Sequence, residues 1–300
     1  MTGLRRLGHR VAANGNGNGW RPLPGLGCVA TCGPMVRFLP FLPSPPLISV
    51  IRLHGMIASS PRAGVLNDVA LAPVIERAFR KGKPKAIALS INSPGGSPAQ
   101  SSLIAARIRR LAEEREVPVH AFVEDVAASG GYWLACAADD IWLDGNSIAG
   151  SIGVISASFG LHDFITRHGI ERRVHTAGKD KSMLDPFRPE RAEDVTRLTA
   201  LQAQIHDGFI DHVKTRRGAR LADNDELFTG EFWVGQKAVG LGLADGIAHL
   251  VPKMKALYGD KTRFAVHGPK RGLFQRLGAQ VVDNALGEIE DRAAWARFGL

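Results

Sequence analysis

From residue 47 onward, short and almost wholly apolar runs alternate with longer amphipathic segments, and this alternation most constrains the fold. The runs expected to form strands are 47–53, 86–91, 117–123, 141–143 and 148–156. The segments with helical spacing of apolar residues are 65–80, 100–115, 126–138, 192–213, 235–243 and 247–258. Strands that alternate with helices predict an α/β domain with mainly parallel pairing, and continuous apolar strands predict a sheet covered on both faces.

The composition changes at both ends of this domain. Residues 1–46 are rich in Gly, Asn, Pro and Arg, so we expect a disordered or loosely packed extension there. The folded domain is expected to span residues 47–260, and the mixed amphipathic residues 261–300 are expected to form a C-terminal helical tail. With 45% hydrophobic and 22% charged residues, the chain has enough apolar material for a sizeable core.

The basic charge of the chain raises the question of an acidic partner. The net charge is +9, but the arginines and lysines are scattered, and no basic run is interleaved with aromatic residues. We therefore expect no nucleic-acid binding, and weak attraction to anionic lipid is the better interpretation. No apolar run reaches the roughly 18 residues needed to cross a bilayer, and no export signal is evident. The expected location is cytoplasmic, with peripheral association to the inner membrane as the alternative.

The three cysteines indicate neither a disulfide scaffold nor a metal site. Cys28 and Cys32 lie four residues apart without a second pair of ligands, and Cys136 lies in an Ala-rich helical stretch. We expect a reduced thiol in the core at Cys136. No metal and no organic cofactor are predicted.

A glycine-flanked serine marks the start of the last apolar run. Ser151 lies between Gly150 and Gly153, and Lys181 follows in a polar segment, with Lys179 as its competitor. This pairing indicates a serine hydrolase in which a lysine amine accepts the hydroxyl proton. A lysine base must be uncharged, so apolar surroundings must lower its pKa from about 10.4 towards 7. The residues that could supply such surroundings are Met183, Leu184, Pro186 and Phe187.

Backbone amides in two glycine-containing segments could stabilise the negative charge of the reaction. Gly95 and Gly96 follow a buried strand, where their amides could form an oxyanion hole, and the amide of Ile152 could contribute. The alternative for Gly95 and Gly96 is an ordinary turn at the end of a strand.

Two other groups of residues offer alternatives to the Ser151–Lys181 pair. Ser129 precedes Gly130 and Gly131 in a small-residue segment, where it is best interpreted as a plain helix cap or as packing beneath the site. A histidine-based triad is recognised by geometry and not by spacing, so it stays open. The candidate histidines are His54, His120, His162, His168, His175, His206 and His212.

Taken together, these segments resemble the signal peptide peptidase A (protease IV) family of serine peptidases, including its shorter SohB-like members. The resemblance covers about residues 47–260. The matching segments are 91–96, 127–132, 150–155, 177–182 with 185–187, and 228–230 through 242–245.

The resemblance implies a ClpP/crotonase-like fold, a spiral of repeated β-β-α units. It also implies an endopeptidase that acts through an acyl-enzyme, with Ser151 as nucleophile, Lys181 as base, and Gly95, Gly96 and Ile152 as oxyanion donors. Peptides or proteins would be the substrates. The family also implies a homo-oligomer in which serine and lysine can come from neighbouring subunits. The alternatives are a crotonase-type acyl-CoA enzyme and an inactive scaffold that binds peptides.

Overall fold

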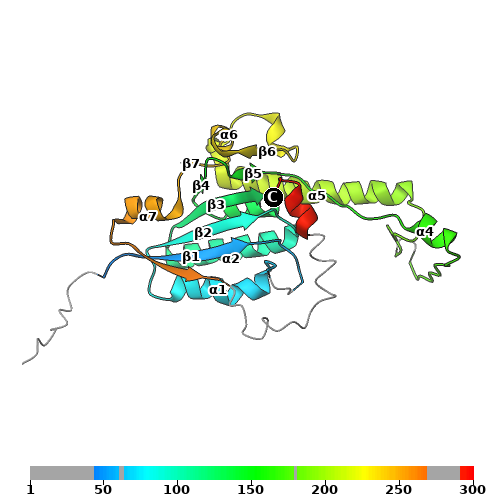
Figure 1. Cartoon of the computed structure of the whole chain (residues 1–300), viewed down its shortest axis with the longest axis horizontal. Helices are drawn as coiled ribbons and strands as arrows, with labels where there is room; N and C mark the ends of the chain where they lie inside the picture. The colour runs from blue at the N-terminus through cyan, green and yellow to red at the C-terminus, as the bar shows by residue number, and fades with distance from the viewer. Residues whose placement is uncertain (1–43, 61–63, 179–180, 269–290) are drawn as a thin grey trace, which may run out of the picture. The chain divides into compact units, whose positions relative to one another are not determined.

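The computed structural model describes residues 44–60, 64–178, 181–268 and 291–300. Within them an eight-stranded sheet forms the centre of the fold (Figure 1). Its strands are β1 (Leu47–His54), β2 (Ala86–Ser93), β3 (Val119–Ala128), β4 (Asp140–Leu143), β5 (Ile148–Gly150), β6 (Phe232–Val234), β7 (Gly246–Ile247) and β8 (Arg263–His267). The order is β6-β5-β3-β2-β1-β8, with β4 paired to β3 and β7 paired to β4. Only the β5–β6 pair is antiparallel among these strands, which confirms the mainly parallel α/β prediction.

Helices connect most of these strands. They are α1 (Asp68–Arg80), α2 (Pro98–Arg115), α3 (Gly130–Ala135), α4 (His162–Arg167), α5 (Ala192–Arg217), α6 (Gly235–Gly240) and α7 (Leu250–Tyr258). Two 3₁₀ turns lie at Gly218–Arg220 and Asp225–Phe228, and residues 291–296 are helical. Local sequence explains where α1 begins, because the Asn67 side chain accepts a hydrogen bond from the Ala70 amide at 2.8 Å. Of the helices in the described ranges, none combines the length and apolarity that crossing a membrane requires.

The two faces of the sheet bury separate sets of apolar residues. Ile51 and Leu53 of β1 belong to a large cluster that includes residues of α1, α2 and α3. Ile48 and Val50 point to the other face, where they belong to a smaller cluster with Met254 of α7. Because side chains alternate along a strand, the continuous apolar pattern of β1 follows from this covering on both faces.

The structure corrects three sequence-based boundaries. The segment 126–138 was predicted as one helix, but residues 126–128 extend β3 and pair in parallel with Ile148–Gly150 of β5. The predicted strand 148–156 ends at Gly150. The sheet also continues beyond residue 260, because β8 pairs with β1. Residues 1–43, most of the predicted N-terminal extension, and residues 269–290 of the predicted tail lie outside the described residues.

Candidate active site

Ser129 occupies a sharp turn between β3 and α3. Its backbone has φ 51° and ψ −121°, a positive-φ conformation that is strained for any residue with a side chain. Its side chain makes no capping hydrogen bond to α3, so the interpretation of Ser129 as a plain helix cap is wrong. A serine on a strained strand-to-helix turn is the geometry by which many serine hydrolases expose a nucleophilic hydroxyl.

Glycines allow the loop after β2 to approach this turn closely. A methyl group added to Gly95 would lie 2.8 Å from the Cβ of Ser129. A methyl group on Gly131 would lie 2.3 Å from the carbonyl oxygen of Ser93. The glycines therefore let the backbone of the β2 loop pack directly against the first turn of α3.

Two backbone amides beside Ser129 are placed to receive negative charge. Within the described ranges, the amides of Gly96 and Gly130 have no hydrogen-bond acceptor, and both residues line one cavity with Ser129. The Gly95 amide instead donates to Ser93 Oγ at 3.2 Å. Of the predicted oxyanion donors, Gly96 lines this cavity, whereas Gly95 and Ile152 are not among its described lining residues.

The cavity beside Ser129 has a volume of about 280 Å³. Its walls are about equally polar and apolar, and the residues that form them come from the loops, from α3 and α5, and from the C-terminal segment, which contributes Ala294 and Arg297. The principal apolar contributors are Met56, Trp133, Ile155, Ile205 and Phe209. A cavity of this size and lining suits a small or apolar side chain of a ligand.

The predicted nucleophile Ser151 lies outside the described lining of this cavity. It is 6% exposed, and its amide donates to the Glu231 carbonyl at 2.7 Å. The space beside Gly150 holds the Trp233 ring, 3.0 Å from the position of an added methyl group. Gly150 therefore leaves room for the chain around β6.

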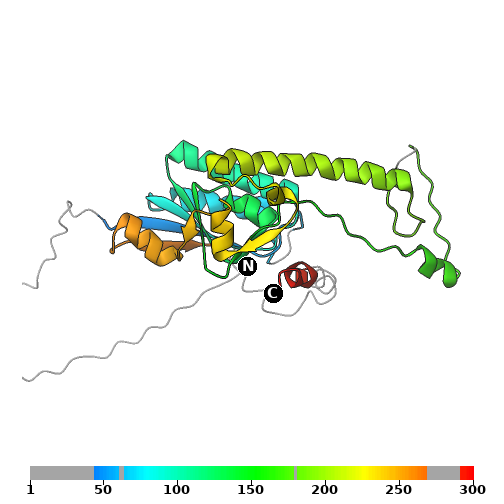
Figure 2. The ribbon, with the colours of Figure 1, turned by 90° about the horizontal axis from the view of Figure 1, so that it is seen from above.

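The segment that contains Lys181 lies at the N-terminal end of α5, which extends away from the sheet (Figure 2). The Leu184 amide donates to Asp194 Oδ2 at 3.3 Å, at the N-terminal end of α5. By contrast, His206, twelve residues further along α5, donates from Nε2 to the Ile152 carbonyl at 3.1 Å. At 1.5 Å per residue these two contacts are about 18 Å apart along the helix.

The Lys181 side chain is exposed, whereas Ser151 is buried. Among the contacts of the described residues, none joins Lys181 to Ser129 or to Ser151. The structure of one chain therefore does not form the predicted pair. Lys179 lies outside the described residues.

The histidine alternatives do not form a triad with either serine. His206 and His212 donate to the backbone carbonyls of Ile152 and Trp133, at 3.1 and 3.2 Å. Within the described part of the chain, no histidine is hydrogen-bonded to Ser129 or Ser151.

One contact among serine, histidine and carboxylate was not foreseen from the sequence. Ser90 Oγ donates to Glu124 Oε1 at 2.6 Å, and His54 Nε2 lies 2.7 Å from Ser90 Oγ. Because the hydroxyl hydrogen points to Glu124, His54 acts as donor and not as the base of a triad.

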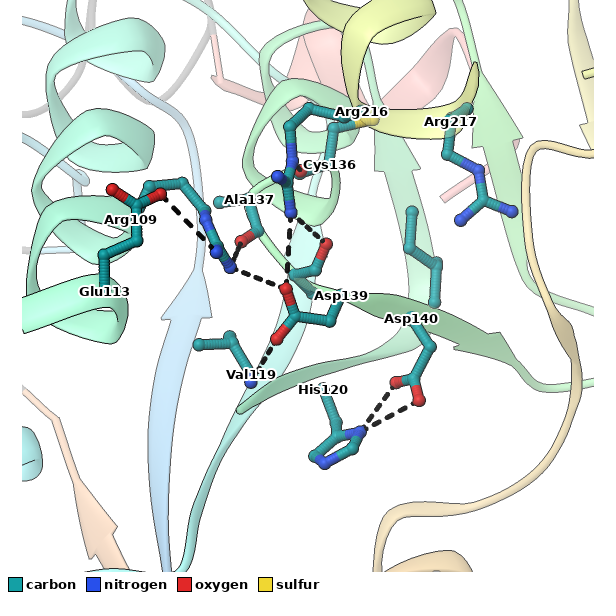
Figure 3. Close-up of polar contacts among 12 residues, drawn as sticks. Arg109, Glu113, Val119, His120, Cys136, Ala137, Asp139, Asp140, Arg216 and Arg217 are labelled. Carbon is teal, nitrogen blue, oxygen red and sulfur yellow. Dashed lines mark hydrogen bonds and ion pairs between the residues drawn. The ribbon is translucent and has the colours of Figure 1, made fainter. Parts of the chain in front are cut away.

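Arginines fix the far end of α3, the helix that begins after Ser129 (Figure 3). Arg216 donates to the carbonyls of Cys136 and Ala138 at 2.8 and 2.9 Å. Arg109 donates to Asp139 at 2.8 Å, and Asp139 also accepts from the Val119 amide at 2.9 Å. Cations are favourable at a helix C-terminus, so these contacts hold the short helix from α2, α5 and β3 together.

Cys136 provides no second nucleophile. Complete burial raises the pKa of its thiol to about 12, so the thiolate is absent at neutral pH. The sequence-based prediction of a core thiol is confirmed.

Comparison with known proteins identifies the family. The model of peptidase family S49 matches residues 112–257. A putative protease of Synechocystis sp. is 31% identical over 66% of this chain and 68% of its own length. The chloroplastic serine protease SPPA of Arabidopsis thaliana is 32% identical over 68% of this chain and 31% of its own length.

The relatives with higher identity carry a different description. The Na(+)/H(+) antiporter NhaA of Brucella melitensis is 47% identical over 84% of this chain, but the match covers 37% of that protein. The chain thus spans about a third of the length of the Brucella and Arabidopsis relatives. The similarities to peptidases agree with the motifs around Ser129 and Ser151, and the chain belongs to peptidase family S49.

Proposed function

We propose that this protein is a serine endopeptidase of the signal peptide peptidase A type, with Ser129 as nucleophile in place of Ser151. The observation that carries this choice is the strained strand-to-helix turn at Ser129, which borders a cavity together with two amides that have no acceptor among the described residues. Ser151 lies apart from that cavity, and its glycine neighbour packs against Trp233.

In the proposed reaction, Ser129 Oγ attacks a peptide carbonyl and Lys181 accepts the hydroxyl proton. The amides of Gly96 and Gly130 stabilise the oxyanion, and each such donor contributes about 3–4 kcal/mol in comparable sites. Lys181 then protonates the leaving amine, and water hydrolyses the acyl-enzyme. The small volume of the cavity and its apolar side chains, such as Met56 and Phe209, favour small or apolar residues of the substrate at the scissile bond.

We further propose that Lys181 reaches Ser129 of a neighbouring copy in a homo-oligomer. Two observations support this: Lys181 is exposed at the far end of α5, and the described segment between β5 and α5 exposes large apolar side chains. These are Ile155 (67%), Phe159 (83%), Phe164 (58%) and Ile170 (56%). Exposed apolar residues in such number are typical of a surface that another chain covers. A ClpP/crotonase-like spiral and a domain close to residues 47–260 remain part of the proposal, because the family resemblance implies both.

The first test compares peptide hydrolysis by wild type with that by four variants. Ser129→Ala and Lys181→Ala should each lower kcat/KM by at least ~10³-fold, because each removes a partner of the same proton transfer. Ser151→Ala and Lys179→Ala are the matched controls and should retain most activity. Loss in Ser151→Ala with retention in Ser129→Ala would restore Ser151 as nucleophile. Four active variants would refute both serine assignments and both lysine assignments, whereas no hydrolysis by wild type would favour a peptide-binding scaffold.

The second test mixes the two inactive proteins. If serine and lysine come from different copies, an equal mixture of Ser129→Ala and Lys181→Ala subunits should regain about one quarter of wild-type activity after subunit exchange. If both groups belong to one chain, every mixed site lacks one of them and the mixture stays inactive.

A further inference from the structure

A band of exposed cations lies where β1, β2 and β8 begin. We call it the basic edge, and it consists of Arg77, Arg80, Lys81, Lys83, Lys85, Lys261 and Arg263. The strands β1, β2 and β3 run parallel, and Ser129 follows the C-terminal end of β3. The basic edge is therefore at the opposite end of the sheet from Ser129 (Figure 1).

Three parts of the basic edge meet around Leu47. The Lys85 amide donates to the Leu47 carbonyl at 2.8 Å, and Leu47 pairs with Arg263 on its other side. A methyl group added to Gly82 would lie 2.5 Å from a Leu47 methyl carbon, so the loop between Lys81 and Lys83 packs on the same residue. Adjacent strands are about 4.8 Å apart, so these cations form one surface.

Among the described residues, the cations of the basic edge have no carboxylate partners. Within the described ranges, none of the seven side chains forms an ion pair, whereas Arg107 binds Asp68 at 2.7 Å and Arg217 binds Asp245 at 2.7 Å. The sequence contains no acidic residue in 77–85 or in 261–263; the acidic neighbours in the chain are Glu76, which pairs with Arg107 at 3.3 Å, and Asp260. The seven side chains thus form a local positive charge that carboxylates of the described residues do not neutralise.

We propose that the basic edge docks the protein onto a membrane surface that contains anionic lipid. Lys and Arg side chains near such a surface are attracted to it, and several together produce appreciable binding. Pro46 and Leu47 are half-buried among these cations, and apolar groups at such a place suit the region between headgroups and acyl chains.

A bilayer fits the basic edge better than a nucleic acid. None of its seven residues is aromatic, so its own side chains offer no ring on which bases could stack. Docking through this edge also leaves the cavity beside Ser129 at the far end of the strands. The proposal goes beyond the peptidase activity and does not depend on it.

Vesicle sedimentation with the full chain tests the proposal. The probes are phosphatidylcholine vesicles with and without about 30% phosphatidylserine, at low salt and at about 0.5 M salt. Wild type should bind the anionic vesicles and not the neutral ones, and high salt should release it. Lys83→Glu/Lys85→Glu removes two cations, each of which contributes about fivefold, so binding should weaken by about 25-fold or more.

Lys237→Glu/Lys214→Glu is the matched control, because both residues are exposed, lie outside the basic edge, and change the net charge equally. The control should keep most of the binding. Equal loss in both double variants would overturn the proposal in favour of a net-charge effect. Unchanged vesicle binding in Lys83→Glu/Lys85→Glu would also overturn it, and a selective loss of duplex DNA binding in that variant would identify the edge as a nucleic-acid surface. Peptide hydrolysis in solution should be the same in all three proteins, so failure here is distinguishable from failure of the proposed activity.

Discussion

Replacement of Gly131 by Ala tests whether close packing of α3 against the β2 loop positions Ser129. The added methyl carbon would lie 2.3 Å from the Ser93 carbonyl oxygen and 3.2 Å from the Ser93 Cβ. Ordinary contact distances begin near 3.4 Å, so α3 and the loop must separate by about 1 Å. Ser93 is fully buried and its oxygen belongs to the backbone, so rotation of a side chain cannot relieve the contact.

Two effects of different size should follow from this displacement. Overpacking of this kind costs about 1–3 kcal/mol, and the better helix propensity of Ala offsets up to about 1 kcal/mol of it. A shift of about 1 Å between catalytic groups lowers the rate by about 100-fold. We therefore expect Gly131→Ala to lose roughly 1–2 kcal/mol of stability but about two orders of magnitude in kcat/KM.

The assay combines urea unfolding, followed by circular dichroism, with hydrolysis of a short peptide by the folded protein. Gly208→Ala is the matched control, because a methyl group there would meet nothing within 4 Å and the residue lies inside α5. The control should be stabilised by up to about 1 kcal/mol and fully active. If Gly131→Ala keeps activity within about threefold of wild type, displacement of α3 does not control the site and the reasoning fails.

Three further predictions concern stability and reactivity. Asp245→Asn removes the carboxylate partner of Arg217, whose side chain is 2% exposed, so urea unfolding should show a loss of about 3–5 kcal/mol in the free energy of unfolding. Glu114→Gln, in the exposed Arg110–Glu114 pair, should cost less than about 1 kcal/mol, and equal losses in the two variants would contradict the role of burial. Burial opposes ionisation of Asp245, but bonds from Arg217 and the Ile141 amide hold its pKa below the usual value. The stability that the ionised carboxylate contributes is present above pH ~4 and is lost as the pH falls further. The difference in free energy of unfolding between wild type and Asp245→Asn should therefore shrink between pH 7 and pH 3, and a constant difference would exclude this linkage. Cys136 should resist iodoacetamide at pH 8 in the native protein and react in urea, as site-resolved mass spectrometry would show; rapid native labelling would disprove its burial.

The architecture was predictable where periodicity is local. The strands β1 and β2 and the helices α1, α2 and α5 appear close to their predicted limits, because apolar spacing alone defines them. The extension of β3 through residues 126–128 was not predictable in this way. Those residues are strand because they pair with β5, and pairing partners twenty residues away leave no periodic signal of their own.

The site was predictable in its segments but not in the choice between two serines. Ser129 and Ser151 both stand next to glycine and both have positive φ, at 51° and 53°. What separates them is the cavity, because Ser129 is among its lining residues and Ser151 is not. Next to Ser151, Gly150 is packed against Trp233, a residue more than eighty positions later. The sequence signal for Ser129 was its place before two glycines, whereas the strand that ends at Ala128 and completes the likeness to a nucleophile elbow is known only from the structure.

Helix α5 connects the chemistry of the site to the proposed assembly. Near its C-terminal half, Phe209 and His212 stack on Trp133 of α3 with ring centroids 4.8 Å apart in each case, which ties the helix to the element that begins after Ser129. Its N-terminal end binds Leu184 through Asp194, close in sequence to Lys181. A helix cannot shorten without breaking its hydrogen bonds, so the separation of about 23–27 Å along α5 between Asp194 and the residues Phe209 and His212 is a fixed property of one chain. If Lys181 is the base, α5 must therefore present it to another copy, and the proposed peptidase would be active only as an oligomer.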